Sequence, residues 1–244
     1  MPESVVLLHG FSGTHRAWDG VVARLHPERY LPRVLDLPGH GDAADAQRPI
    51  TFANCAEHVL ARSPAQFVLC GYSLGGRVAL HVALTAPERV ARLVLVSTTA
   101  GIEDPAERAE RQLADHRLAD ELERGGWAGF DSFIERWRTQ PLFAEDSPEV
   151  GTLAREDQRR NRPDALAAVL RGIGTGEMAP LWGRLGELRM PVTMLAGGRD
   201  AKFQALGRRM VELLPNAELV VVPGGHGLPL ENPAAVAERL SIDP

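Results

Sequence analysis

Six short runs of β-branched residues and leucine, spaced along the chain, limit the possible folds more than any other feature of this sequence. They are VVLL (5–8), VLDL (34–37), FVLC (67–70), LVLVS (93–97), VTML (192–195) and LVVV (219–222). Such runs are typical of strands that a parallel sheet buries on both faces. Helix-length segments at 52–62, 75–86 and 203–214 lie between them. The pattern therefore predicts βαβ crossovers and a doubly wound α/β fold.

The interval between Ser97 and Val192 departs from this alternation, because it contains no run typical of a strand. It is far longer than a usual connection between a helix and a strand. Three of its segments have the composition and the terminal residues of helices. They are DPAERAERQLADHRLADELERGG (104–126), FDSFIERW (130–137) and PDALAAVLRG (163–172). We therefore expect residues 101–184 to form a helical cap over a core built from residues 1–100 and 185–244.

Length and charge restrict the partners of the chain. With 244 residues, 44% of them hydrophobic, it fits one domain with a large apolar core. Its net charge of -5 is spread without a long block of one sign, which gives no basic surface for nucleic acid. We expect a small-molecule partner, no nucleic acid, and a monomer or weak homo-oligomer.

The cysteines and the first residues bear on the cellular compartment. Cys55 and Cys70 are the two cysteines of the sequence; they indicate no disulfide framework, and we interpret both as core residues. The start MPESVVLLHG lacks the basic and long apolar regions of a signal peptide, and no 18-residue apolar stretch follows. We expect a cytoplasmic protein that does not bind a membrane.

The stretch GYSLG (71–75) matches G-x-S-x-G, a pattern that places a serine on a sharp turn from a strand into a helix. FVLC precedes it and GGRVALHVALTAP follows it, so the required strand and helix are both expected. Ser73 is therefore the candidate catalytic serine. The alternative is a small serine in an ordinary strand-to-helix turn.

A catalytic serine in this setting requires an acid and then a histidine later in the chain. Asp200 follows the run VTML, and His226 follows LVVV. Both are expected at the carboxyl ends of strands, where open α/β sheets form their ligand sites. The alternatives are a helix N-cap for Asp200, since a helix is expected near Phe203, and a loop histidine beside glycines for His226.

These residue types together suit proton transfer. His226 can take the proton of the Ser73 hydroxyl while Asp200 fixes its tautomer and stabilises the imidazolium. Negative charge developing on a substrate needs hydrogen-bond donors, and the backbone N–H groups of Leu74, at a helix start, and Phe11 are the candidates. His40, in DLPGHGD, is interpreted as structural rather than catalytic.

Several motifs extend over nearly the whole chain: LHGFSG (8–13), DLPGHG (36–41), GYSLGGR (71–77), AERAERQ (106–112), ERWRTQPLF (135–143), LRGIGTG (170–176), LW (181–182) and RDAKF (199–203). The first three resemble those of α/β-hydrolase-fold proteins in general. The set as a whole is similar to the 2-succinyl-6-hydroxy-2,4-cyclohexadiene-1-carboxylate synthases of menaquinone biosynthesis.

The resemblance implies an α/β-hydrolase fold with a mostly parallel sheet, flanked by helices. We expect six or seven strands, because SVVLLHG at the start leaves no room for the two strands that precede it in fuller hydrolases. The resemblance also implies a lyase, without metal or organic cofactor, that eliminates pyruvate from 2-succinyl-5-enolpyruvyl-6-hydroxy-3-cyclohexene-1-carboxylate. In that family the serine is expected to act as a base on a substrate C–H. The alternative is a carboxylester or thioester hydrolase that uses the same triad covalently.

A polycarboxylate substrate requires fixed cations, and guanidinium groups match carboxylates through paired planar hydrogen bonds. Arg77 lies four residues after Ser73, on the same helix face, so its side chain can lean toward the site. The alternative is an ion pair that ties this helix to a neighbour. Arg111 matches a second substrate-binding arginine of the resembling family; its alternative is an exposed helix charge with i,i+4 partners.

The resemblance implies further residues that bind the substrate. A third arginine is expected in REDQRRNRP, where Arg159 is the candidate and Arg160 its rival. Trp137 resembles a tryptophan that lines the substrate site, although it could equally anchor the cap to the sheet. Tyr72, beside the serine, could line the pocket or only pack against its neighbours.

Overall fold

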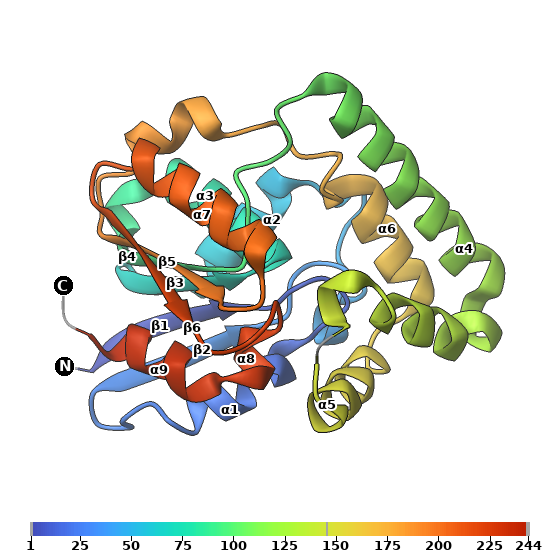
Figure 1. Ribbon diagram of the computed structural model, residues 1–244, viewed down its shortest axis with the longest axis horizontal. Coiled ribbons are helices and arrows are strands. Elements are labelled where there is room, and N and C mark those ends of the chain that lie inside the picture. The colour runs from blue at the N-terminus through green and yellow to red at the C-terminus, as the bar shows by residue number, and fades with distance from the viewer. Residues whose placement is uncertain (1, 145, 243–244) are drawn as a thin grey trace.

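A six-stranded sheet, parallel throughout, forms the centre of the molecule (Figure 1). The computed structural model describes residues 2–144 and 146–242. Its strands are β1 (Glu3–Leu8), β2 (Tyr30–Leu35), β3 (Phe67–Tyr72), β4 (Val90–Val96), β5 (Val192–Gly197) and β6 (Ala217–Val222). The strand order is β2-β1-β3-β4-β5-β6, so the direction of winding reverses between β1 and β3. Ligand sites form at such a reversal, outside the carboxyl ends of the strands.

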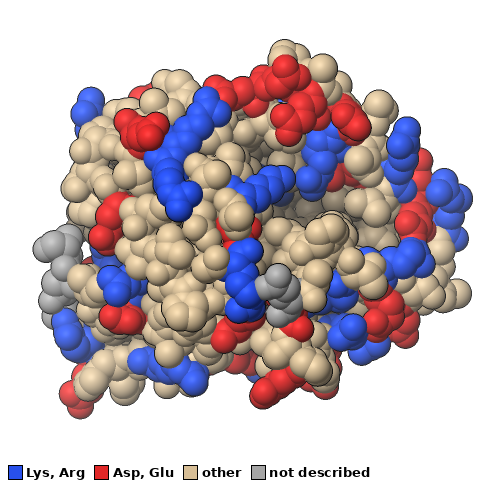
Figure 2. Space-filling model, in the orientation of Figure 1, with Lys and Arg blue, Asp and Glu red and all other residues tan. Residues whose placement is uncertain are grey.

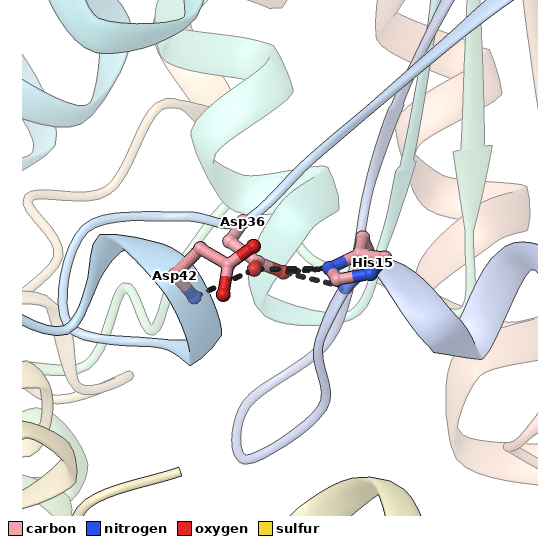
Figure 3. Close-up of side chains that lie close together, drawn as sticks. All are labelled: His15, Asp36 and Asp42. Atoms are coloured by element: carbon pink, nitrogen blue, oxygen red, sulfur yellow. Dashed lines mark hydrogen bonds and ion pairs between the residues drawn. The ribbon is translucent and has the colours of Figure 1, made fainter. Parts of the chain in front are cut away.

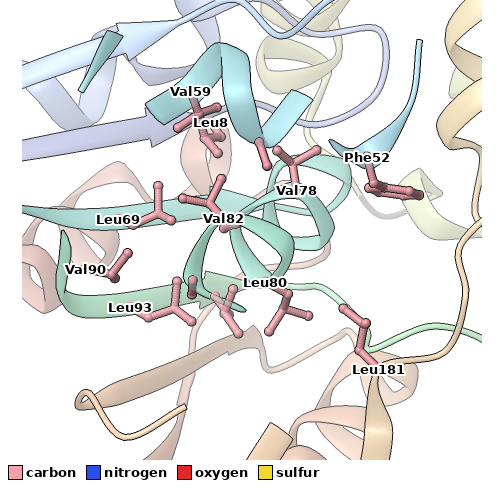
Figure 4. Close-up of a cluster of buried hydrophobic side chains, with 14 of the residues drawn as sticks. Leu8, Phe52, Val59, Leu69, Val78, Leu80, Val82, Val90, Leu93 and Leu181 are labelled. Atoms are coloured by element: carbon pink, nitrogen blue, oxygen red, sulfur yellow. The ribbon is translucent and has the colours of Figure 1, made fainter. Parts of the chain in front are cut away.

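Helices cover both faces of the sheet. One apolar layer joins the sheet to α2 (Phe52–Arg62), α3 (Leu74–Thr85) and α7 (Ala201–Leu213). The other joins it to α1 (Asp19–Val22), α8 (Leu228–Glu231) and α9 (Pro233–Ser241). Figure 4 shows the first layer around α3, where Leu80 and Val82 pack toward strand residues such as Leu93. The four inner strands β1, β3, β4 and β5 are buried over most of their length, which explains their continuous apolar runs. The edge strands β2 and β6 are only partly buried, contrary to the sequence-based expectation.

The residues between β4 and β5 form a separate helical layer. It contains α4 (Pro105–Arg138), α5 (Pro148–Gln158) and α6 (Pro163–Ile173), and α4 and α6 lie side by side at one end of the molecule (Figure 1). Leu122, Phe133 and Ile134 of α4 pack against Leu166 and Leu170 of α6. The inserted helices therefore have an apolar core of their own. The proposed boundaries at residues 100/101 and 184/185 stay a prediction.

Two segments differ from the sequence-based expectation. The expected helices 104–126 and 130–137 form one helical run, α4, with a break at Gly126, where φ is 47° and ψ is -147°. The strand expected at 34–37 begins four residues earlier, at Tyr30, and ends at Leu35, so β2 includes Pro32. Proline is tolerated in an edge strand, and β2 is an edge of this sheet. In the ranges 2–144 and 146–242, the structure contains no helix that is long and apolar enough to span a bilayer.

Candidate active site

Ser73 lies on the turn between β3 and α3, at the carboxyl edge of the sheet. Its backbone has φ 52° and ψ -108°, a conformation that non-glycine residues rarely adopt. The flanking glycines make this turn possible, since a Cβ on Gly71 would lie 2.3 Å from the carbonyl oxygen of Gly75, and a Cβ on Gly75 2.2 Å from that of Leu8. The turn therefore holds the serine hydroxyl clear of the backbone, at the start of α3.

His226 and Asp200 reach Ser73 from the loops after β6 and β5. Nε2 of His226 lies 3.3 Å from Oγ of Ser73, and Nδ1 of His226 lies 2.9 Å from Oδ2 of Asp200. The His226 and Asp200 side chains are buried. The other carboxylate oxygen of Asp200 accepts a hydrogen bond from the N–H of Phe203 at 3.4 Å. Asp200 thus caps α7 and also orients the histidine, so the two interpretations of this residue are compatible.

A cavity of about 890 Å³ opens above these three residues, between the sheet and the inserted helices. Figure 2 shows a hollow near the centre of the visible face, with basic and acidic side chains interspersed around it. The candidate oxyanion-hole residues Phe11 and Leu74 line the cavity. Leu74 is the first residue of α3, and the N–H groups of a first helical turn have no acceptor within the helix. Its amide is therefore suited to stabilise an anion beside Ser73.

Arg77 lines this cavity from α3 although only 7% of its surface is exposed. Its Nη1 donates to the carbonyl oxygen of Ile173 at 2.8 Å, and its guanidinium lies 5.7 Å from the ring centre of Phe52. Burial, together with the nearby charge of Arg111, lowers the pKa of Arg77 to about 9, so the group is charged at neutral pH. The hydrogen bond to Ile173 connects α3 to α6. It uses one N–H of the guanidinium, and the other N–H groups take no part in it.

Arg111 lines the same cavity from α4. Its Nε lies 2.8 Å from Oδ1 of Asp115, one helical turn further on. Asp115 is buried and also accepts a hydrogen bond from the N–H of Gly176 at 3.2 Å. Arg111 therefore has the i,i+4 partner of an ordinary helix charge and also faces the cavity. The structure brings it close enough to Arg77 for its charge to lower the pKa of that group.

Arg159 does not lie at the cavity, which is a correction to the sequence-based expectation. Its Nε lies 2.7 Å from Oδ1 of Asp131 on the outer surface, and hydrogen bonding to Asp131 raises its pKa. Arg160, the rival candidate, is exposed. The physical reason is the phase of α5: its last two residues, Asp157 and Gln158, are buried, so the next two side chains, Arg159 and Arg160, point outward.

The two aromatic candidates occupy different places. Trp137 lines the cavity and its ring lies 4.9 Å from that of Phe11 in an edge-on arrangement; it also packs against the core of the inserted helices. Tyr72 lies beside the triad, 5.4 Å between ring centres from His226. It lines a small adjoining cavity behind Phe11, rather than the large one. Burial raises the pKa of its hydroxyl.

Three basic residues of the cavity were missed by the sequence analysis, and one of them is Arg199, next to Asp200. Lys202 and Arg209 both line it from α7. Lys202 is part of the motif RDAKF, two residues after Asp200, so its position in the sequence could have indicated it. Arg209 forms an ion pair with Glu103 and lies 4.1 Å from the ring centre of Trp182. No pattern in the sequence marks it, because its position depends on the phase of α7.

One group of side chains outside the cavity has ligand types suited to a metal. His15, Asp36 and Asp42 each place one ligand atom within 4.8 Å of the others. Figure 3 shows the group between the loops after β1 and β2. The Asp36 carboxylate, however, already accepts hydrogen bonds from the N–H of His15 at 2.6 Å and from the N–H of Asp42 at 2.8 Å. These bonds assign the group a structural role in joining the two loops.

Comparisons with known proteins show the family of the chain. The model of the alpha/beta hydrolase family matches residues 5–239. The chain is 32% identical to the 2-succinyl-6-hydroxy-2,4-cyclohexadiene-1-carboxylate synthase of Salmonella agona, over 98% of this chain and 92% of the relative. It is 35% identical to a Bacillus subtilis protein provisionally named as the same synthase, over 98% and 89% of the two chains.

Solved structures give the same result. The structure of MenH from S. aureus superimposes with a TM-score of 0.88 at 30% identity, covering 98% of this chain and 91% of that one. An enol-lactonase from Burkholderia xenovorans superimposes with a TM-score of 0.80 at 20% identity, covering 98% and 90%. The second likeness concerns the fold alone.

Proposed function

The chain belongs to the alpha/beta hydrolase family and, within it, to the 2-succinyl-6-hydroxy-2,4-cyclohexadiene-1-carboxylate synthases, and we propose that it eliminates pyruvate from the enolpyruvyl precursor of that product. The observation that carries the proposal is the pair Arg77 and Arg111, which lines the cavity above Ser73. A substrate with three carboxylates supplies partners for these cations. A neutral ester supplies none, so the hydrolase alternative is not favoured.

The elimination balances without a co-reactant. Removal of the proton on ring carbon 2, next to the ketone of the succinyl group, forms the double bond between carbons 2 and 3. The existing double bond then shifts to carbons 4 and 5, and the bond from carbon 5 to the enolpyruvyl oxygen breaks. The departing enol takes up a proton on its methylene carbon and becomes pyruvate.

The site residues have distinct roles in this proposal. Ser73 Oγ receives the proton from carbon 2 as its own proton passes to Nε2 of His226, 3.3 Å away. Asp200, 2.9 Å from Nδ1, stabilises the imidazolium. The negative charge that reaches the succinyl ketone oxygen is stabilised by the amides of Phe11 and Leu74. No covalent enzyme intermediate is required.

The basic side chains of the cavity are proposed to bind the carboxylates of the substrate. Arg77 and Arg111 are placed to bind one or two of them by charge-assisted hydrogen bonds. Lys202, which lines the cavity from α7, is the candidate for the third cation that the sequence analysis assigned to Arg159. Trp137 supplies an apolar wall for the ring.

The compartment and the assembly state are also proposals. Cys55 and Cys70 are free and buried, and burial raises the pKa of the Cys55 thiol to about 12 and also raises that of Cys70. Both thiols are therefore unreactive core groups, which suits a reducing cytoplasm. We propose a cytoplasmic monomer or weak homo-oligomer that acts on a small polycarboxylate.

The test is direct. Purified protein is mixed with 2-succinyl-5-enolpyruvyl-6-hydroxy-3-cyclohexene-1-carboxylate, and pyruvate is measured with lactate dehydrogenase and NADH. We expect pyruvate and the cyclohexadiene product in equal amounts. Saturable turnover of neutral esters with no release of pyruvate would contradict the proposal.

A further inference from the structure

Every polar group of Ser12 is held by a hydrogen bond. Its N–H donates to Nε2 of His40 at 3.3 Å, its carbonyl oxygen accepts from Nδ2 of Asn161 at 2.7 Å, and its Oγ accepts from Nε2 of Gln158 at 2.8 Å. The residue has φ 60°, which a serine adopts only where its surroundings impose it. Ser12 immediately follows Phe11, whose amide is the second anion donor of the site.

Two of these three contacts come from the inserted helical layer. Gln158 is the last residue of α5, and Asn161 lies in the turn between α5 and α6. Asp157 adds a third contact, since its carboxylate accepts from the N–H of Thr14 at 2.8 Å and also from the hydroxyl of Thr14. All of these side chains are buried. Residues 157–161 therefore form a polar anchor for the loop that carries Phe11.

The anchor also extends to the loop after β2. Oδ1 of Asn161 accepts a hydrogen bond from the N–H of Gly41 at 3.0 Å. His40, next to Gly41, is fully buried, and burial lowers its pKa well below the usual value. Its ring is therefore neutral and can accept from the Ser12 N–H. One amide side chain, that of Asn161, thus connects the loops after β1 and β2 to the inserted layer.

We infer that Asp157, Gln158 and Asn161 are positioning residues that hold the amide of Phe11 in the geometry of the anion site. None of them lines the large cavity, so they act through residues 10–14 and not by touching the substrate. Buried polar contacts of this kind fix one arrangement, because breaking any of them leaves a buried group without a partner. The inserted layer is in this way a part of the catalytic machinery as well as a cover for the cavity.

The inference assumes the anion-binding role that the proposed function gives to Phe11, so its test uses two readouts. Gln158→Leu and Asn161→Ala are compared with the wild-type protein and with Glu156→Ala, an exposed position on the same helix. The first readout is kcat and KM for pyruvate release. The second is hydrogen exchange at the amides of residues 10–14, measured by mass spectrometry, which needs no substrate.

We expect kcat to fall about 10- to 100-fold in both variants, because loss of a whole anion donor costs 10²–10³ and these variants displace one without removing it. KM stays within about threefold. Exchange at residues 10–14 accelerates at least tenfold, whereas Glu156→Ala changes neither readout. If either variant fails to fold, Ser12→Ala removes the contact to Gln158 with a smaller change in volume and gives the same comparison.

Three results would overturn the inference: kcat within twofold of wild type in a folded variant, a rise in KM with kcat unchanged, or unchanged exchange at residues 10–14. The second would show that residues 157–161 bind the substrate instead. Absence of pyruvate from the wild-type protein would contradict the proposed function alone, because hydrogen exchange would still decide whether residues 157–161 position the loop.

Discussion

Replacement of Arg77 by methionine separates the proposed lyase from a general hydrolase most clearly. Methionine keeps the apolar stem of the side chain and removes the charge. Nη1 of Arg77 donates one N–H to Ile173, so four of the five N–H groups of the guanidinium remain, and a substrate carboxylate can accept one or two of them. A hydrogen bond to a charged group contributes about 1.5 to 3 kcal/mol. Since Arg111 remains, we expect a loss of about 2 to 4 kcal/mol in transition-state binding, or about 30- to 1000-fold in kcat/KM.

The assay for this variant is the coupled release of pyruvate, with Arg184→Met as the control. Arg184 is exposed, pairs with Glu187 and does not line the cavity, so its removal should leave kcat/KM within twofold. Thermal unfolding of both variants verifies that they are folded. An Arg77→Met enzyme that retains wild-type kcat/KM would refute the reasoning. An equal loss on a small neutral ester, such as 4-nitrophenyl acetate, would show a structural role instead.

Two other changes test the site, and a third tests a partly buried histidine of α3. Ser73→Ala should lower kcat for pyruvate release by about 10³ or more, because it removes the proton acceptor. The wild-type enzyme should release product without a burst before steady state. A burst would indicate a covalent intermediate. Lys202→Met should lower kcat/KM about two- to fivefold, mainly by raising KM, because an exposed ion pair with the substrate contributes little. The loss should be smaller at high salt. Arg208→Met, on the same helix, should leave kcat/KM unchanged. Burial lowers the pKa of His81 to about 4 from 6.5, so the unfolded chain binds more protons between pH 6.5 and 4, and the free energy of unfolding falls on acidification in that window. The free energy of unfolding, measured with urea, should fall by about 1 kcal/mol less between pH 7.5 and 5 in His81→Phe than in the wild-type protein, after a discount for the partial exposure of His81. The same fall in both proteins would contradict the lowered pKa of His81.

The parallel strands and the three residues of the triad could be derived from the sequence because both depend on local features. A buried parallel strand is a continuous apolar run, and Ser73, Asp200 and His226 each lie within a few residues of the end of a strand. The family prediction and the α/β-hydrolase fold are confirmed by the comparisons. Roles of individual site residues stay predictions until the variants are measured.

The position of Arg159 could not be derived from the sequence. Helix α5 was not recognised in the sequence, so the direction of its side chains was unknown. One residue along a helix turns the side chain by about 100°, which is the difference between the buried Gln158 and the exposed Arg159. The contacts between Ser12 and residues 157–161 could not be derived from the sequence either, because Ser12 and Gln158 lie 146 residues apart in the chain.

The proline in β2 has a consequence for how copies of this protein can meet. An exposed sheet edge is a template on which a second chain can add a strand. Pro32 removes one N–H from β2, which is the edge on that side of the sheet. A strand that tried to extend the sheet there would meet a chain with a donor missing near its middle. This edge is therefore a poorer template for a strand from a second copy of the chain.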